Sequence, residues 1–413
     1  MKVCIVSRSD GRSGGFAAAY RLYQSLLQSG VDANMLVEDK QRDDSTVLSP
    51  KSKIAKGWAK FVPTLDALPL SLYPQRERGS YSMQWVPDRV AAKIARIAPE
   101  VINLHWINAG YVQLETVAKF KKPIVWTLHD MWAFTGGCHY SGDCDRYIKS
   151  CGSCPQLHSS SDWDISRLLW QRKAKAWQNL NLTIVTPSAW LAERARASSL
   201  FQDLRIEVIP NGINTQSYKP IDKKTAKDIL GLPQDKQIIL FGATNAASDL
   251  RKGFHLLLPA LQLLQQSHGD RLEVVVFGSS QPSNPPDFGY KTHYLGKLYD
   301  DISLSLAYSA ADVFVAPSIQ DNLPNTVMEA LACGTPCVAF KIGGMSDLIS
   351  HQQCGYLAQP FVVEDLSQGI SWVIENIERH HKLASNARKK VEENFTFKIQ
   401  SSRYLALYKQ VTT

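Results

Sequence analysis

Two carboxylates, Asp321 and Glu329, stand eight positions apart in the 413-residue chain and could bind one ligand together. The apolar run that ends at Pro317 predicts a buried strand, and the residues from about Asn325 predict a helix that carries Glu329 about one turn from its start. A helix N-terminus offers N–H groups and a positive dipole end to an anion, while carboxylates accept hydrogen bonds from vicinal hydroxyls. The pattern is typical of a site for a sugar or ribose beside a phosphate.

A basic pair and a glycine pair add groups that favour a phosphate. Lys252 follows the predicted strand 237–242 after a loop and precedes Gly253, which opens the next predicted helix. A lysine here can neutralise a departing diphosphate, and Arg251 can add a second charge. The glycines Gly14–Gly15 lack Cβ atoms and allow close approach of the backbone to a phosphate or sugar. The alternatives are solvated surface charge for the basic pair and a plain tight turn for the glycines.

Two histidines end predicted strands. His129 closes the apolar run Pro123–His129 and is followed by Asp130, and His105 closes the run Val101–His105. Ligands of α/β sheets bind at the carboxyl ends of the strands, so these side chains are candidates for a binding site. A structural role for each histidine is the alternative.

Four cysteines, Cys138, Cys144, Cys151 and Cys154, follow one another with the spacing Cys-x5-Cys-x6-Cys-x2-Cys. In a reducing compartment four such thiols can hold a tetrahedral structural zinc ion, and His139 could take one place. Free buried thiols and a conditional disulfide are the alternatives. The remaining cysteines lie in apolar contexts that predict core thiols.

Short apolar runs alternate with helix-length amphipathic segments through both halves of the chain. Strands that are apolar throughout indicate parallel sheets covered on both faces, and strand–helix alternation indicates right-handed βαβ units. We therefore expect an α/β fold with two doubly wound parallel-sheet domains. The predicted strands are Lys2–Ser7, Val31–Val37, Val101–His105, Pro123–His129, Leu182–Thr186, Gln237–Gly242, Leu272–Gly278, Val313–Ala316 and Cys337–Phe340. Predicted helices include Pro87–Ala98, Phe254–Gln266, Ile302–Ala310 and Asn325–Cys333.

A proline and an Asn-Gly pair within Val208–Ile213 predict the boundary between the domains and a hinge. The expected domains are residues 1–207 and 208–395, with a last helix of about residues 396–413 that packs back on the first domain.

The positive charge is one-sided. Residues 1–200 hold 26 Lys+Arg against 17 Asp+Glu, whereas the remainder holds 20 against 21, so the formal net charge of +8 divides into +9 and −1. This favours an anionic partner for the N-terminal half, such as a membrane surface or a phosphorylated ligand, over nucleic acid.

The segment 39–81 fits the alternating pattern least well. It interleaves Lys51, Lys53, Lys56 and Lys60 with Trp58 and Phe61. We expect a solvated surface loop, or alternatively a mobile flap that contacts an acceptor or a lipid interface. The apolar run Met1–Ser7 is too short for a signal-peptide core, and no uncharged run of about 18 apolar residues occurs. These observations predict a cytoplasmic protein.

The stretch Asp321–Val338, D-N-L-P-N-T-V-M-E-A-L-A-C-G-T-P-C-V, resembles the donor-binding motif of the retaining nucleotide-sugar glycosyltransferases of family four. The resemblance implies their GT-B fold, in which two Rossmann-like, doubly wound parallel-sheet domains face a cleft. The family pattern is E-G-F-P-N-x-x-x-E-A-x-A-x-G-x-P-V-V. The departure is Asp321 where glutamate is usual. Further similarities are TLHD at Thr127–Asp130, TPS at Thr186–Ser188 and RKG at Arg251–Gly253, and an arginine of the family is replaced by Ala243.

The resemblance implies a role for each residue. Glu329 would hold the ribose hydroxyls, Asp321 and His129 would face the donor sugar, and Lys252 with Arg251 would stabilise the leaving diphosphate. His105 and Asp130 would lie on the acceptor side. The other donor-binding residues would be Gly14, Gly15, Gly296, Leu298, Asn322, Pro324, Asn325 and Thr326.

The resemblance also implies a partner and a reaction. An NDP-sugar would donate its sugar, with retention, to a glycan or a polyprenyl-diphosphate-linked acceptor at the inner face of the cytoplasmic membrane, as in bacterial capsule, exopolysaccharide or O-antigen synthesis. No Asp-x-Asp motif stands at a strand end, so no cofactor is expected for catalysis. An NDP-sugar epimerase or hydrolase and a non-catalytic nucleotide-sugar-binding subunit are the rival interpretations.

Overall fold

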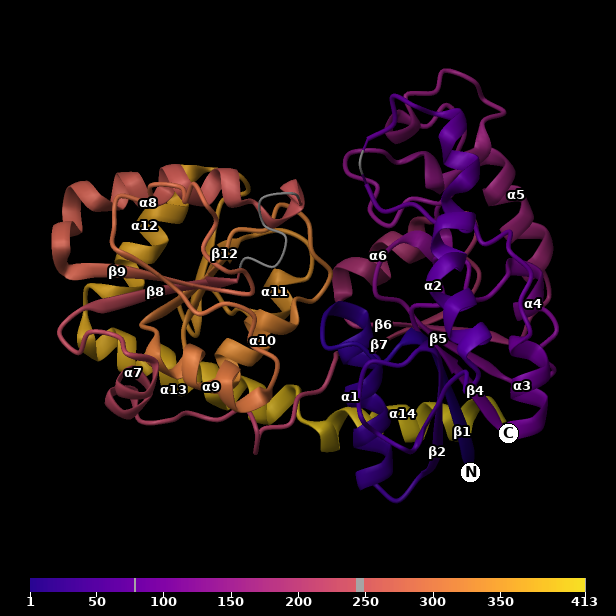
Figure 1. The fold of residues 1–413 in the computed structure, drawn as a ribbon, viewed down its shortest axis with the longest axis horizontal. Coiled ribbons are helices and arrows are strands. Elements are labelled where there is room, and N and C mark those ends of the chain that lie inside the picture. Colours follow the sequence, from indigo (N-terminus) through magenta and orange to yellow (C-terminus); the bar gives the residue numbers. More distant parts are fainter. Residues whose placement is uncertain (78, 243–248, 413) are drawn as a thin grey trace. The chain divides into compact units, whose positions relative to one another are not determined.

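The computed structural model describes residues 1–77, 79–242 and 249–412, and Ala243 therefore lies outside the described residues. The chain divides into two units. Unit 1 comprises Met1–Asn211 together with Lys398–Thr413, and unit 2 comprises Gly212–Phe397 (Figure 1). Each unit is an α/β structure built on one parallel sheet, as the sequence predicts.

Unit 1 contains a seven-stranded sheet in the order β3-β2-β1-β4-β5-β6-β7. The strands β1, β4, β5 and β6 are almost wholly buried, which explains their continuous apolar character. The strands are β1 (Lys2–Ser9), β2 (Asp32–Asp39), β3 (Val47–Leu48), β4 (Val101–Leu104), β5 (Ile124–Thr127), β6 (Leu182–Thr186) and β7 (Arg205–Val208). The helices are α1 (Gly14–Gln28), α2 (Lys53–Ala67), α3 (Val90–Ile97), α4 (Leu114–Val117), α5 (Ile165–Trp177), α6 (Ala189–Ala197) and α14 (Phe397–Thr412).

The helix α14 ends the chain and packs on the sheet of unit 1 beside α1. The hydroxyls of Tyr404 and Thr127 lie 2.9 Å apart, and the hydroxyl of Tyr408 donates to Oδ1 of Asn103 at 2.7 Å. Because both tyrosines are buried, these bonds satisfy polar groups that the apolar face would otherwise leave unpaired.

The segment 39–81 differs from the loop that the sequence analysis expects, because helix α2 occupies its middle. Ser52 caps the helix by accepting a hydrogen bond from the N–H of Ala55, and Ala59 and Val62 are buried. Asp66 accepts a hydrogen bond from the N–H of Met83 at 3.0 Å. The cap and the buried face stabilise this helix. Its many lysines make the segment resemble a solvated loop when only the composition is considered.

Unit 2 contains a six-stranded sheet in the order β10-β9-β8-β11-β12-β13. Its strands are β8 (Gln237–Gly242), β9 (Leu272–Phe277), β10 (Thr292–Tyr294), β11 (Val313–Ala316), β12 (Cys337–Phe340) and β13 (Gly355–Ala358). Its helices are α7 (Lys223–Leu230), α8 (Phe254–His268), α9 (Asp301–Ala310), α10 (Asn325–Ala332), α11 (Met345–Leu348), α12 (Val363–Ile374) and α13 (Ile377–Asn394). Helices α8 and α12 cover one face, and α7, α9, α10 and α13 cover the other (Figure 1).

Within the described residues, none of the helices combines the length and the apolar character that crossing a bilayer requires.

Candidate functional site

The strand order of unit 2 reverses between β8 and β11, which are neighbours in the sheet. From β8 the chain adds β9 and β10 on one side, and it then returns to add β11, β12 and β13 on the other. Doubly wound sheets bind ligands at such a switch point, outside the carboxyl ends of the strands. Lys252 follows β8 and Asp321 follows β11, so the sheet topology itself brings these two residues to one place.

The two loops that leave β8 and β11 are joined through their backbones. The N–H of Ile319 donates to the carbonyl of Arg251 at 2.8 Å. Gly253 has φ +67°, and a Cβ atom at this position would lie 1.8 Å from the carbonyl oxygen of Pro317. Only glycine allows this approach, so Gly253 fixes where the preceding Lys252 lies.

Lys252 and Asp321 form an ion pair in which Nζ donates to Oδ2 at 2.9 Å. The Asp321 side chain is 13% exposed and the Lys252 side chain 41% exposed. The nearby Asp321 carboxylate raises the pKa of Lys252, although desolvation opposes the shift. In the free protein each residue thus neutralises the other, a contact that sequence spacing did not reveal.

Glu329 lies in α10 and is almost completely buried. The hydroxyl of Tyr308, which comes from α9, donates to Oε2 of Glu329 at 2.9 Å. Phe277 and Phe314 pack edge-on against the ring of Tyr308 and hold it in place. Tyr308 therefore positions the Glu329 carboxylate, and no signal in the sequence pointed to it.

A glycine pair after β12 supports the backbone of Asp321. Gly343 has φ +49°, and a Cβ atom there would lie 1.9 Å from the Asp321 carbonyl oxygen. The N–H of Gly344 donates to that same oxygen at 3.2 Å. The sequence analysis missed this pair, although two consecutive glycines after a predicted strand were a usable signal.

The remaining donor-side candidates of unit 2 also lie at this edge of its sheet. Asn322 is buried, Pro324 is the N-cap of α10, and Asn325 and Thr326 are the first residues of the helix. Gly296 follows β10, and its carbonyl accepts a hydrogen bond from the N–H of Gly278 at the end of β9. Leu298 packs against the apolar cluster that contains α9 and α10.

Arg251, which the sequence suggests as a second charge beside Lys252, makes an ion pair within its own loop. Its guanidinium forms a two-point ion pair with Asp249, with Nη2–Oδ2 at 2.7 Å and Nε–Oδ1 at 3.1 Å. Because Asp249 stands only two residues away, this pair is local to the loop and occupies much of the positive group.

In unit 1 the strand order reverses between β1 and β4. Gly14 and Gly15 begin α1 after β1, and His129 follows β5. A Cβ atom on Gly15 would lie 2.7 Å from Cγ of His129, so the glycine allows the imidazole to pack against the start of α1. His105 Nδ1 and His129 Nε2 share a hydrogen bond of 2.9 Å.

The two imidazoles are neutral at neutral pH. Burial lowers the pKa of His129 to about 4 and the pKa of His105 well below its ordinary value, and for His105 the neighbouring His129 acts in the same direction. The pair therefore offers hydrogen bonds and not positive charge to a ligand.

Asp130 has partners within unit 1. Its Oδ2 lies 2.7 Å from Nδ1 of His139 and accepts a hydrogen bond from Nε1 of Trp106 at 2.9 Å. Burial raises the pKa of Asp130, but His139 and the other donors outweigh it, so the pKa is lowered. The second nitrogen of His139 lies 2.9 Å from Oγ of Ser82. Both ring nitrogens of His139 are therefore engaged, which argues against the sequence-based suggestion that it replaces a cysteine as a metal ligand.

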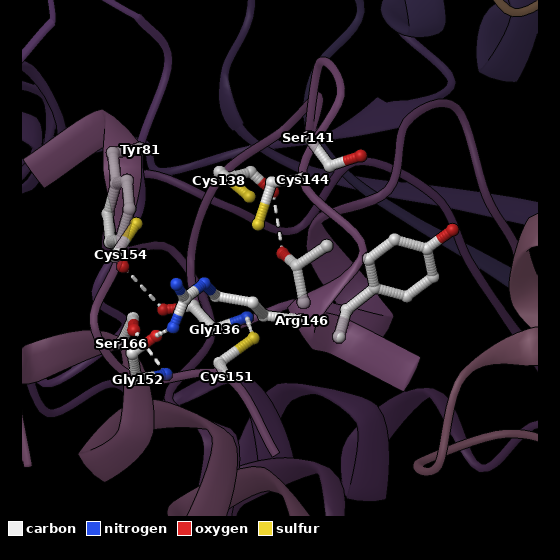
Figure 2. A pocket seen from close by; sticks show the side chains of 12 residues that line it. Tyr81, Gly136, Cys138, Ser141, Cys144, Arg146, Cys151, Gly152, Cys154 and Ser166 are labelled. Atoms are coloured by element: carbon white, nitrogen blue, oxygen red, sulfur yellow. Dashed lines mark hydrogen bonds between the residues drawn. The ribbon is translucent and has the colours of Figure 1, made fainter. Parts of the chain in front are cut away.

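All four clustered cysteines line one pocket of unit 1, and all four are free thiols (Figure 2). Within the described part of the chain, no three His, Cys, Asp or Glu side chains are already arranged to hold a metal ion. The buried Lys173 lies nearby on α5. Its burial lowers the pKa to about 7, while Cys151, Cys138 and Asp130 favour its charged form.

Comparison with known families identifies both units. The family model described as "Glycosyltransferase Family 4" matches residues 13–217, and the model described as "Glycosyl transferases group 1" matches residues 222–390. The two matches together take in most of the chain, and the chain belongs to the glycosyltransferases that combine these two domains.

Several curated proteins are similar to parts of the chain. The putative colanic acid biosynthesis glycosyl transferase WcaC of Escherichia coli is 28% identical over 58% of this chain and 60% of its own length. The sulfoquinovosyl transferase SQD2 of Arabidopsis thaliana is 27% identical over 84% of this chain and 66% of its own length. The matches cover between 40% and 70% of the length of these and other curated relatives.

Solved structures share the fold over the whole chain. Sucrose-phosphate synthase from Thermosynechococcus elongatus superposes with a TM-score of 0.70 at 18% identity, covering 100% of this chain and 99% of that one. HepE from Anabaena, solved with UDP, gives 0.66 at 16% identity and covers 99% and 100%. These structures confirm the predicted GT-B architecture of two parallel-sheet α/β domains.

Proposed function

We propose that the chain is a retaining glycosyltransferase that transfers a sugar from a nucleoside diphosphate sugar, held by unit 2, to a glycan or polyprenyl-diphosphate-linked acceptor held by unit 1. One observation carries the proposal. Lys252 and Asp321 form an ion pair at the switch point of unit 2, and Glu329 lies in α10, the helix that begins after the loop of Asp321. A cation, two carboxylates and a helix N-terminus match a diphosphate flanked by two hydroxyl-bearing rings.

The Lys252–Asp321 pair suggests how the donor is bound. Lys252 turns from Asp321 to the diphosphate, where it stabilises the charge that develops on the leaving group. Asp321 is then released to accept hydrogen bonds from the hydroxyls of the donor sugar. Glu329, held from behind by Tyr308, accepts hydrogen bonds from the ribose. The acceptor hydroxyl attacks from the face of the leaving group, and the departing phosphate takes its proton.

The names of similar proteins support this substrate class. HepE from Anabaena has been solved in complexes with UDP, with UDP and glucose, and with UDP-glucose. WcaC is described with colanic acid biosynthesis. Bacterial polysaccharide synthesis, with a hexose as the transferred group, is accordingly our proposal for this chain.

Helix α2 supports contact with an anionic membrane. Ile54, Trp58 and Phe61 are 87%, 48% and 53% exposed, and the lysines beside them are exposed as well. Aromatic and aliphatic side chains among lysines suit an anionic lipid interface. Replacing Lys53, Lys56 and Lys60 with glutamine should reduce sedimentation with phosphatidylglycerol vesicles. The same change at Lys121 and Lys122 should not, and equal binding by all variants would exclude this face.

The function is tested first by donor binding. Purified chain is screened by thermal shift against UDP-, GDP- and ADP-sugars, because a ligand that binds only the native state raises its melting temperature. The donor found is then used with Glu329→Gln and, as a matched control, Glu378→Gln on the exposed start of α13. We expect binding to fall by about tenfold or more in the first variant and to persist in the second.

Transfer is tested with the same donor and a lipid-linked or oligosaccharide acceptor, and the anomeric configuration of the product is read by NMR. Retention supports the proposal. An inverted product, or epimerised or hydrolysed donor without transfer, overturns it in favour of another GT-B activity. Donor binding without turnover of any acceptor would favour a non-catalytic nucleotide-sugar-binding subunit.

A further inference from the structure

The segment 135–164 of unit 1 is unusually irregular for its length. It runs from the short turn Trp132–Phe134 to α5, and it contains only two further 3₁₀ turns, Arg146–Ile148 and Pro155–Leu157. Irregular connections longer than about 12–15 residues are uncommon in compact domains unless something ties them down or gives them a function. The four clustered cysteines all lie in this segment.

The fold brings the four thiols together around one pocket. Cys138, Cys144, Cys151 and Cys154 line the same pocket, together with Tyr81 and Arg146 among others (Figure 2). The thiols are also close enough to act on one another electrostatically.

The backbone between Cys151 and Cys154 forms a tight turn with three consecutive positive φ angles. Cys151 and Ser153 have φ +54° and +44°, values that residues with side chains rarely adopt, and Gly152 between them has φ +93°. The N–H of Gly136 donates to Sγ of Cys151 at 3.1 Å. An N–H bond to sulfur and a tight turn between two cysteines are features that orient thiolates around a metal.

Positive charge lies beside the pocket. Lys173 is completely buried, and its Nζ donates to the carbonyls of Trp132 and Thr135 and lies 3.8 Å from the centre of the Trp132 ring. Arg146 lines the pocket itself. A buried cation needs a counter-charge, and a zinc ion with four thiolates carries a net charge of −2.

We propose that Cys138, Cys144, Cys151 and Cys154 bind one Zn²⁺, which fastens the segment 135–164 to unit 1. The four thiols release four protons to solvent as the four Zn–S bonds form. As no three such side chains among the described residues already converge on a metal position, the thiols must turn inward on binding. A change of rotamer about the single χ1 torsion of cysteine moves Sγ without moving the backbone.

The experiment measures zinc in the full chain, purified without chelators or an affinity metal. We expect about one zinc per chain by mass spectrometry of the metal, in line with a structural four-cysteine site. An organomercurial that blocks thiols should release that zinc to a colorimetric indicator without any substitution, so the result does not depend on a variant that folds. Zinc well below stoichiometry, or a disulfide among the four cysteines in non-reducing peptide mapping, overturns the proposal.

Two single substitutions locate the metal. Cys144→Ser should lower the bound zinc at least severalfold. Cys354→Ser, which removes a buried thiol of unit 2, should leave it unchanged. Equal zinc in both variants would place the metal elsewhere and overturn the assignment. Because these readings need no donor or acceptor, they succeed or fail independently of the proposed glycosyl transfer.

Discussion

The ion pair between Lys252 and Asp321 makes a prediction in which two neighbouring substitutions act in opposite directions on ligand binding. Lys252→Met removes the cation that we assign to the diphosphate, so affinity for UDP or whichever nucleoside diphosphate the screen identifies should fall. Asp321→Asn removes the carboxylate that holds Lys252 in the free protein. The lysine no longer has to leave an ionic partner, so affinity for the same nucleoside diphosphate, which lacks the sugar, should rise.

The magnitudes follow from burial. The Lys252 side chain is 41% exposed, so the pair resembles a surface ion pair worth about 0–1 kcal/mol, and Asp321→Asn should tighten binding by no more than about fivefold. The Asp321 carboxylate is only 13% exposed, so Lys252→Met leaves a poorly solvated charge without its lysine and should destabilise the protein by about 1–2 kcal/mol. That cost corresponds to roughly 2–8 °C in the melting temperature of a domain of this size.

Isothermal titration calorimetry and thermal unfolding of the two single variants and the double variant measure both effects. Lys382→Met, on the exposed side of α13, controls for removal of a lysine from unit 2. The double variant should recover part of the stability lost in Lys252→Met, because no charge is left enclosed. Weaker nucleotide binding by Asp321→Asn, or strictly additive stability changes, would refute this account of the pair.

Three further predictions rest on individual contacts. Tyr308→Phe removes a hydrogen bond to the buried Glu329 carboxylate and should lower the free energy of unfolding by about 1.5–3 kcal/mol in urea titrations, with weaker donor binding by calorimetry. Gly253→Ala places a Cβ atom 1.8 Å from a carbonyl oxygen and should lower the melting temperature far more than Gly231→Ala, which has a similar φ but open space around it; equal losses would contradict this. Burial lowers the pKa of His129 to about 4 from 6.5, so the stability it confers is complete above pH 6.5 and is lost as the pH falls toward 4. We expect a loss of about 2–3 kcal/mol between pH 7 and pH 4.5 in urea titrations, and a smaller loss in His129→Asn.

The predicted strands show which part of the fold can be predicted from short stretches of the sequence. Val313–Ala316 and Cys337–Phe340 coincide with β11 and β12, because a strand buried on both faces is apolar at every position. Pro123–His129 was too long, since β5 ends at Thr127. Leu128 remains buried and His129 half-buried after the ladder stops, and an apolar pattern cannot distinguish burial from pairing.

The candidate site depends more than the strands do on contacts between residues that are distant in the sequence. Asp321, Glu329 and Lys252 were found because a helix start, a glycine and charged residues leave local signals. Tyr308 left none, since its importance lies in an edge-on aromatic cluster that three elements build together. Gly343 is comparable, because its need for a missing Cβ arises from a carbonyl in another loop.

The two basic residues of this loop show why charge alone does not assign a role. Arg251 is held at two points by Asp249, a neighbour in the same turn. Lys252 is held at one point by Asp321, which comes from the loop of another strand. In the proposed complex a diphosphate replaces Asp321 as the partner of Lys252, and sugar hydroxyls replace Lys252 as the partners of Asp321. Breaking the Lys252–Asp321 pair is therefore compensated on both sides, whereas the Arg251–Asp249 pair can stay intact in that complex. We therefore expect the positive charge at the leaving group to come from Lys252 and from the N-terminal end of α10, and we expect Arg251 to shape the loop that presents them.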